Sequence, residues 1–206
     1  MDASWFRGGL LVLFGYLLGS VPFGVLVAWA FDRELDLRKS GSGNIGATNV
    51  MRTLGKGAGL LTLLLDVGKG ILALAIARSF LDPSAHHWLA LVGGAVFLGH
   101  IFPVYLRFKG GKGVAAALGV VLFLSPETAF VLVVLFAAVL YFTRYVSLGS
   151  LCAAVGLPVA MAFLGRSRHY VTLALVMSFL VIYTHRGNIH RLLAGQESKF
   201  GGPPAE

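Results

Sequence analysis

Long apolar runs alternate with short polar segments along the whole chain. A bilayer accepts only structures whose backbone polar groups are all satisfied internally, and runs of about 20 apolar residues predict spanning helices. Seven such runs cover residues 4–31, 58–80, 87–106, 114–125, 128–142, 148–164 and 170–184. The pattern predicts an all-α integral membrane protein with seven transmembrane helices, forming one domain over residues 1–206.

Prolines and glycines mark the positions at which the apolar runs should bend or end. Gly19, Pro22 and Gly24 predict bends within the first run, and Pro126 separates the fourth run from the fifth. The fourth run is short, since its residues give only roughly 18 Å of helix at a rise of ~1.5 Å each. The distribution of charge among the polar segments favours keeping the fourth and fifth runs apart.

With seven spans, the polar segments 32–57, 107–113, 143–147 and 185–206 all lie on one side of the membrane. That side carries most of the 17 Lys and Arg residues, namely Arg33, Arg38, Lys39, Arg52, Lys56, Arg107, Lys109, Lys112, Arg144, Arg186, Arg191 and Lys199. The opposite side carries only Arg7, Arg78, Arg166 and Arg168. Because basic loops stay in the cytoplasm, we expect the N-terminus outside and the C-terminus inside.

Composition supports a membrane protein, since 57% of the residues are hydrophobic and 13% are charged, against roughly a quarter charged in soluble domains. The net charge of +8 does not indicate nucleic-acid binding, because the basic residues lie in short loops between spans. It fits anionic lipid headgroups and an anionic substrate. The single cysteine, Cys152, excludes an internal disulfide.

The longest polar segment contains a glycine-rich stretch, Ser40-Gly-Ser-Gly-Asn-Ile-Gly-Ala-Thr-Asn49. Glycines allow backbone N–H groups to turn inward and approach an anion closely. Ser42, Gly43 and Asn44 are therefore candidate phosphate-binding residues, with the nearby Arg52 supplying positive charge. The stretch is equally consistent with a plain glycine-rich turn between helices.

A second glycine-rich loop precedes the fourth run and reads Gly110-Gly111-Lys112-Gly113. A helix start offers unpaired N–H groups and the positive end of the helix dipole, and Lys112 adds a mobile ammonium. The spacing is not that of a Walker A motif, and no strand precedes it. The alternative is a basic turn that holds the helix in the lipid headgroups.

Two further polar clusters on the same side could take part in chemistry. His185 and Asn188 lie at i and i+3 if the last run continues as a helix, and an unperturbed His pKa near ~6.5 suits proton transfer at neutral pH. Ser147, near Arg144, is a candidate hydrogen-bond donor or an interfacial residue.

Ionisable residues also lie well inside two of the spans. Asp66 and Lys69 are spaced i, i+3 in the second run, and we expect them to neutralise each other and to hold helices together. His100, near the end of the third run, is expected to be a packed helix residue rather than a ligand.

Several kinds of site are excluded by spacing. No His, Cys and carboxylate set has zinc spacing, no Gly-x-Ser-x-Gly elbow occurs, and few carboxylates lie on the basic side to hold Mg²⁺. We therefore expect neither a metal nor a cofactor. An acyl phosphate suits such a site, because this mixed anhydride is already activated and needs only alignment and charge stabilisation.

Three motifs occur in a fixed order, Ser42-Gly-Asn-Ile-Gly-Ala-Thr-Asn49, Gly110-Gly-Lys-Gly113 and His185-x-x-Asn-Ile-x-Arg191. They resemble the motifs of the bacterial acyl-phosphate:glycerol-3-phosphate 1-acyltransferases. The segments 65–70, 100–103 and 144–147 look like further parts of this family's pattern. The resemblance covers nearly the whole chain and leaves out only the tail after Glu197.

This resemblance implies acyl transfer from acyl phosphate to the 1-hydroxyl of glycerol 3-phosphate, giving lysophosphatidic acid. It places the protein in the bacterial cytoplasmic (inner) membrane with the site facing the cytoplasm. Neither coenzyme A nor acyl carrier protein would be the direct donor. The expected partners are the two substrates and membrane lipids, with no nucleic acid and no obligate protein partner.

By motif position, Arg52 and Lys112 would bind phosphates together with the glycine backbone. Ser42 and Ser147 would donate hydrogen bonds, and His185 with Asn188 would orient the attacking hydroxyl. The proton could go to His185 or to a substrate phosphate oxygen.

Two other functions compete with this enzyme. A transporter or channel for an organic phosphate would also need basic, glycine-rich loops, but transporters usually bind near the midplane between repeats, and no convincing internal repeat occurs. A purely structural or lipid-scaffolding protein would leave His185, Asn188 and the two glycine loops unexplained.

Overall fold

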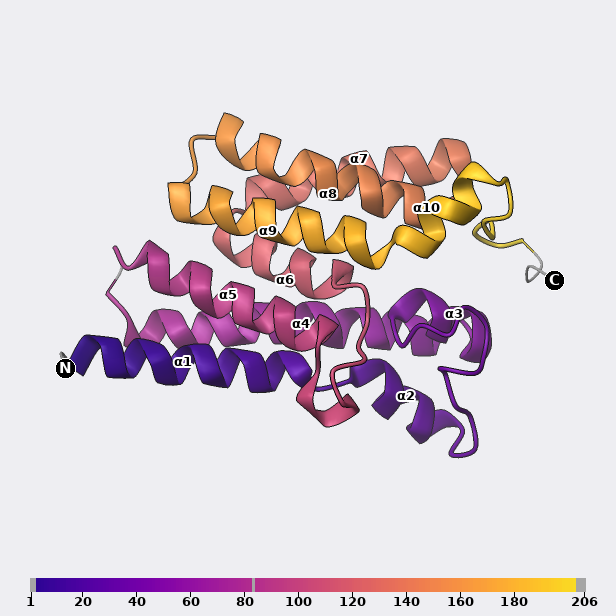
Figure 1. Ribbon diagram of the computed structural model, residues 1–206, viewed down its shortest axis with the longest axis horizontal. Helices are drawn as coiled ribbons and strands as arrows, with labels where there is room; N and C mark the ends of the chain where they lie inside the picture. Colours follow the sequence, from indigo (N-terminus) through magenta and orange to yellow (C-terminus); the bar gives the residue numbers. More distant parts are fainter. Residues whose placement is uncertain (1–2, 83, 203–206) are drawn as a thin grey trace. The chain divides into compact units, whose positions relative to one another are not determined.

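The structure is a computed structural model that describes residues 3–82 and 84–202, and over those ranges it is entirely helical (Figure 1). In chain order its elements are α1 (Ala3–Ser20), α2 (Phe23–Phe31), α3 (Ala47–Leu54), α4 (Lys56–Phe80), α5 (His86–Ile101), the 3-10 helix η1 (Val104–Leu106), α6 (Val114–Leu124), α7 (Pro126–Thr143), α8 (Val146–Phe163), α9 (Arg168–Thr184) and α10 (Arg186–Leu193). The chain divides into two compact units, Met1–Phe123 and Leu124–Glu206. The expectation that residues 1–206 form a single domain stays a prediction.

The described helices include several that could cross a membrane. Five stretches are long and apolar enough, and the bent pair α9 and α10 makes a sixth if it counts as one span. The helix α6 is apolar but has only 11 residues. The predicted break at Pro126 is confirmed, because this proline begins α7, where its missing N–H leaves no hydrogen bond unmade.

In the first unit, the long apolar run at the N-terminus is two helices, as its proline and glycines predicted. The chain breaks at Val21 and Pro22 between α1 and α2. Helix α1 packs along α5, and a Cβ at Gly19 or at Gly99 would overlap the backbone of the other helix. Small residues allow two helices to approach this closely inside a membrane.

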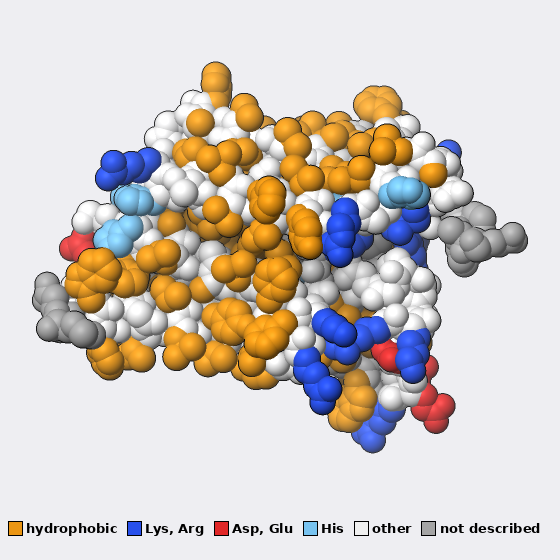
Figure 2. Space-filling model, in the orientation of Figure 1, with side chains coloured by type: hydrophobic (Ala, Val, Ile, Leu, Met, Phe, Trp, Pro, Cys, Tyr) orange, Lys and Arg blue, Asp and Glu red, His pale blue; other side chains and the backbone are white. Residues whose placement is uncertain are grey.

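The polar segment of the first unit contains a short helix, α3, that the apolar pattern did not predict. Helix α3 packs against α4, and a buried apolar cluster ties it to its surroundings. That cluster consists of Val27, Ala28, Leu37, Val50 and Ala58. Figure 2 shows Lys and Arg side chains gathered over α2, α3 and the loop between them. Over α1 it shows mainly hydrophobic side chains. The unit therefore has one markedly basic end.

In the second unit, α8 packs against both α7 and α9. Large apolar side chains on this unit are exposed, among them Phe130, Tyr141, Phe142 and Phe163, as expected for helices that face lipid. The last apolar run does not continue as one straight helix through Asn188. It ends at Thr184, and α10 leaves at an angle of 57°. His185 lies at this bend.

Candidate active site

The predicted site residues fall into both units. The first unit holds Ser42, Gly43, Asn44, Arg52, Gly110, Gly111, Lys112 and Gly113, and the second holds Ser147, His185 and Asn188. Within each unit the structure shows how these residues are positioned.

Asn49 fixes the shape of the first glycine-rich loop. Its side chain is buried, and its Oδ1 accepts a hydrogen bond from the Ser42 N–H at 2.7 Å. Its Nδ2 donates to the carbonyl oxygens of Leu37 at 3.2 Å and Ser40 at 3.0 Å. Gly41 (φ 58°) lies in the left-handed region that favours glycine, and a Cβ there would overlap Asn49 Oδ1. Asn49 is therefore a structural residue of the loop.

Several backbone N–H groups of this loop donate hydrogen bonds within it. Besides Ser42, the Gly43 N–H donates to the Ser40 carbonyl at 3.0 Å, and the Gly46 N–H donates to Asn44 Oδ1 at 3.3 Å. These three N–H groups do not form the inward-facing cradle that the glycine spacing suggested. An anion at this loop would instead meet the exposed side chain of Ser42 and the exposed Arg52 on α3.

The second glycine-rich loop folds back onto the end of α5. The Gly110 N–H donates to the Ile101 carbonyl at 3.0 Å, and the Gly111 N–H donates to the His100 carbonyl at 3.1 Å. Gly113 adopts a φ of 88°, and α6 begins at the next residue. In this loop, Lys112 and the first N–H groups of α6 are therefore the candidates for binding an anion.

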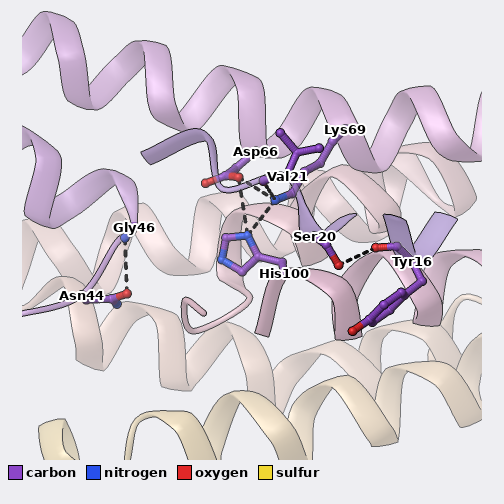
Figure 3. Close-up of polar contacts among 8 residues, drawn as sticks. All are labelled: Tyr16, Ser20, Val21, Asn44, Gly46, Asp66, Lys69 and His100. Atoms are coloured by element: carbon purple, nitrogen blue, oxygen red, sulfur yellow. Dashed lines mark hydrogen bonds and ion pairs between the residues drawn. The ribbon is translucent and has the colours of Figure 1, made fainter. Parts of the chain in front are cut away.

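Beneath these loops lies a buried group of ionisable side chains, Asp66 and Lys69 on α4 and His100 on α5 (Figure 3). Lys69 Nζ lies 2.8 Å from Asp66 Oδ1 and 2.9 Å from His100 Nδ1. The predicted Asp66–Lys69 pair is confirmed, and so is the packed position of His100. That the three residues form one cluster was not predicted.

In the second unit, His185 is buried and has a defined tautomer. Its Nδ1 lies 2.8 Å from the Val181 carbonyl oxygen. A carbonyl can only accept, so Nδ1 carries a proton, and in the neutral ring Nε2 is the basic nitrogen. This arrangement suits a general base.

Glu197 organises the other site residues of the second unit. Its Oε1 accepts from Asn188 Nδ2 at 2.6 Å and its Oε2 from Arg191 Nε at 2.8 Å, and its side chain is only 7% exposed. Burial raises the pKa of Glu197, but hydrogen bonds from Asn188 and Arg191 outweigh this and hold the pKa below its ordinary value. The carboxylate therefore links α10 and the C-terminal tail.

The tail is fixed by further contacts with the chain before α8. The Phe200 N–H donates to the Arg144 carbonyl at 2.6 Å, and the Arg144 guanidinium donates to the Phe200 carbonyl at 3.3 Å. Arg144 thus has a structural contact. Sequence reasoning did not single out Glu197, although an acidic residue in a strongly basic tail was a signal that could have found it.

Comparison with known proteins gives consistent matches over nearly the full chain. A family-level profile described as glycerol-3-phosphate acyltransferase matches residues 9–195. A glycerol-3-phosphate acyltransferase of Mesorhizobium japonicum is 50% identical over 93% of this chain and 95% of its own length. One of Synechococcus sp. is 48% identical over 93% of this chain and 94% of its own length.

Two solved structures are also similar. A crystal structure of PlsY, an integral membrane glycerol 3-phosphate acyltransferase, in its glycerol 3-phosphate form matches with a TM-score of 0.89 and 43% identity. It covers 94% of this chain and 96% of its own. The lysophosphatidic acid form matches with a TM-score of 0.87 and 42% identity, covering 94% and 95%.

Proposed function

Because this chain belongs to the glycerol-3-phosphate acyltransferase family, we propose that it transfers a fatty acyl group from acyl phosphate to the 1-hydroxyl of sn-glycerol 3-phosphate. The products are lysophosphatidic acid and phosphate. Glycerol 3-phosphate as acceptor and lysophosphatidic acid as product are supported by the near-complete match to relatives named for this activity. One of these relatives has been solved in glycerol 3-phosphate and lysophosphatidic acid forms. Acyl phosphate as donor rests on the chemistry of a site rich in cations.

The reaction needs no covalent enzyme intermediate. The hydroxyl oxygen attacks the acyl carbon, a new C–O bond forms, and the bond from that carbon to the bridging oxygen breaks as phosphate leaves. Arg52 and Lys112 bind the phosphates, and the hydroxyls of Ser42 and Ser147 donate hydrogen bonds to them. These cationic and hydrogen-bonding groups stabilise the charge that develops in the transition state.

His185 takes the proton from the attacking hydroxyl at Nε2. Its Nδ1–H bond to Val181 supports this role, because it keeps Nε2 unprotonated in the neutral ring. Asn188 donates through Nδ2 to Glu197, which directs its amide oxygen as an acceptor for the substrate hydroxyl. A substrate phosphate oxygen is the competing proton acceptor.

The protein works in the bacterial inner membrane with seven spans and its basic segments in the cytoplasm. Six spans follow from length and composition when α9 and α10 count as one. The seventh is α6, whose 11 residues reach about 16 Å at ~1.5 Å per residue, roughly half of the apolar core. Counting α6 keeps the basic segments on one side, with the N-terminus outside and the C-terminus inside.

A product assay tests the function. Purified protein in lipid receives glycerol 3-phosphate with palmitoyl phosphate in one tube and with palmitoyl-CoA in another, both without added metal. We expect lysophosphatidic acid and free phosphate from the palmitoyl phosphate tube alone. Product from palmitoyl-CoA alone would overturn the proposal that acyl phosphate is the donor. No product in either tube, from folded protein, would overturn the proposal that the protein is an acyltransferase.

A further inference from the structure

The buried side chains of Asp66, Lys69 and His100 contact one another. The Lys69 ammonium has three N–H groups and three partners: the Asp66 carboxylate in an ion pair at 2.8 Å, His100 Nδ1 at 2.9 Å, and the Val21 carbonyl, to which it donates at 3.1 Å (Figure 3). Buried charges persist when they are paired in this way. None of the three residues has a role in the reaction described above.

The contacts with α4 fix the orientation of the His100 ring. Its Nδ1 lies 2.9 Å from Lys69 Nζ and 3.4 Å from Asp66 Oδ1. The ring is thereby held in one orientation, with Nδ1 toward α4 and Nε2 toward the chain that follows α5.

The Nε2 edge of His100 supports the Gly110–Gly113 loop. A Cβ at Gly111 would overlap His100 Nε2, and its three nearest atoms all belong to this ring. The Gly111 N–H also donates to the backbone carbonyl of His100. Gly111 therefore contacts His100 through both the ring and the backbone. Because Lys112 directly follows Gly111, this contact also bears on the position of Lys112.

The same cluster reaches the first glycine-rich loop. Val21, which accepts from Lys69, lies at the break between α1 and α2. Shortly after it, Gly24 lies against the carbonyl of Ile45 inside the Ser40–Asn49 stretch, with no room for a Cβ. A small pocket bordered by Val21, Gly24, Ile45 and all three cluster residues lies at this junction. The cluster thus contacts the supports of both loops.

We propose that Asp66, Lys69 and His100 are positioning residues that set the geometry of the two glycine-rich loops, chiefly through the contact of His100 with Gly111. They tune the binding of a phosphorylated substrate without touching it. This inference rests on the proposed function, in which Lys112 and its loop bind a substrate phosphate.

A double-mutant cycle between His100 and Gly111 tests the contact. Gly111→Ala introduces a methyl group into the His100 ring and should lower kcat/KM about tenfold, mainly through KM for one of the two phosphorylated substrates. His100→Asn keeps an acceptor near the position of Nδ1 for Lys69 but removes the Nε2 edge. The double variant should therefore recover most of the activity that Gly111→Ala alone loses.

Gly68→Ala is the matched control, because Gly68 lies in α4 between the two charged residues and a Cβ there meets nothing within 4 Å. It should keep wild-type kinetics. The wild type and this control should both be active. If the fold-changes in kcat/KM caused by His100→Asn and by Gly111→Ala simply multiply in the double variant, the positioning role is refuted. If the wild type makes no lysophosphatidic acid, the proposed function itself has failed.

The ion pair provides a second test that separates positioning from stability. Lys69→Met removes the ammonium from the buried Asp66 carboxylate, whose remaining neighbour is His100 Nδ1 at 3.4 Å, and should lower the Tm strongly. Asp66→Asn with Lys69→Met removes both charges and should restore most of the lost Tm. The double variant should still show a raised KM, because His100 has lost the ammonium that orients it. A KM restored together with the Tm would show a merely structural cluster and overturn the proposal.

Discussion

Replacing Glu197 by glutamine tests how the second unit positions Asn188. The two side chains have the same shape, but glutamine offers one accepting oxygen and one donating nitrogen in place of two carboxylate oxygens. Asn188 and Arg191 each donate to a different oxygen of Glu197, so one of these donors would face another donor. The negative charge opposite Arg191 would also be lost.

The magnitude follows from the number of bonds affected. Hydrogen bonds to a charged group contribute about 1.5–3 kcal/mol each and those between neutral groups about 0.5–1.5 kcal/mol. Glu197→Gln removes one such bond and weakens the other, at a cost of about 2–3 kcal/mol. For a chain of this size that corresponds to a Tm lower by roughly 4–12 °C.

Thermal unfolding of purified protein in detergent, measured as a function of pH, is the assay. The pKa of Glu197 is lowered in the folded state, so its stabilisation is fully present above the unfolded value of about 4.3 and is lost as pH falls through the lower folded value. The Tm difference between wild type and Glu197→Gln should be constant near neutral pH and shrink below about pH 4.

Glu34→Gln is the control, since Glu34 is exposed in the loop before α3, and it should leave the Tm unchanged. A Glu197→Gln variant with the wild-type Tm at neutral pH would refute the reasoning. A Tm difference that persists undiminished in acid would equally show that the carboxylate charge is not what holds Asn188 and Arg191.

Three other predictions concern the remaining site residues. His185→Ala should abolish most turnover and flatten the pH–rate profile between about pH 5.5 and 7.5; an unchanged profile would favour proton transfer to a substrate phosphate. Arg52→Ala and Lys112→Ala should raise KM for a phosphorylated substrate, lower kcat, or both, without unfolding the protein, and wild-type kinetics in either folded variant would remove that residue from the site. Asn49→Ala loses three hydrogen bonds and should cost about 2–3 kcal/mol, read as a lower Tm; an unchanged Tm would show that Asn49 does not hold the loop.

Features set by neighbouring residues could be predicted from the sequence. The breaks at Pro22 and Pro126 follow from a proline's own geometry, and the Asp66–Lys69 pair follows from the spacing of a helix. The two breaks and the ion pair depend only on chemistry within a few residues. The three motifs are also local, and their order together with the topology was enough to find the family.

Features set by tertiary contacts could not be predicted in this way. His100 joins Lys69 across 31 residues, and Glu197 reaches Asn188 from a tail nine residues away. The glycine spacing suggested free N–H groups, but the buried Asn49 amide and the end of α5 determine where those of Ser42 and Gly111 point. The bend at His185 likewise has no proline to mark it.

The measurement that tests the central claim most directly follows the bridging oxygen of the donor. Palmitoyl phosphate labelled with ¹⁸O between the acyl carbon and phosphorus is turned over with glycerol 3-phosphate, and the released phosphate is examined by ³¹P NMR. Attack on the acyl carbon predicts lysophosphatidic acid together with phosphate that carries one ¹⁸O atom. Unlabelled phosphate, or labelled phosphate without lysophosphatidic acid, would contradict acyl transfer from acyl phosphate to glycerol 3-phosphate.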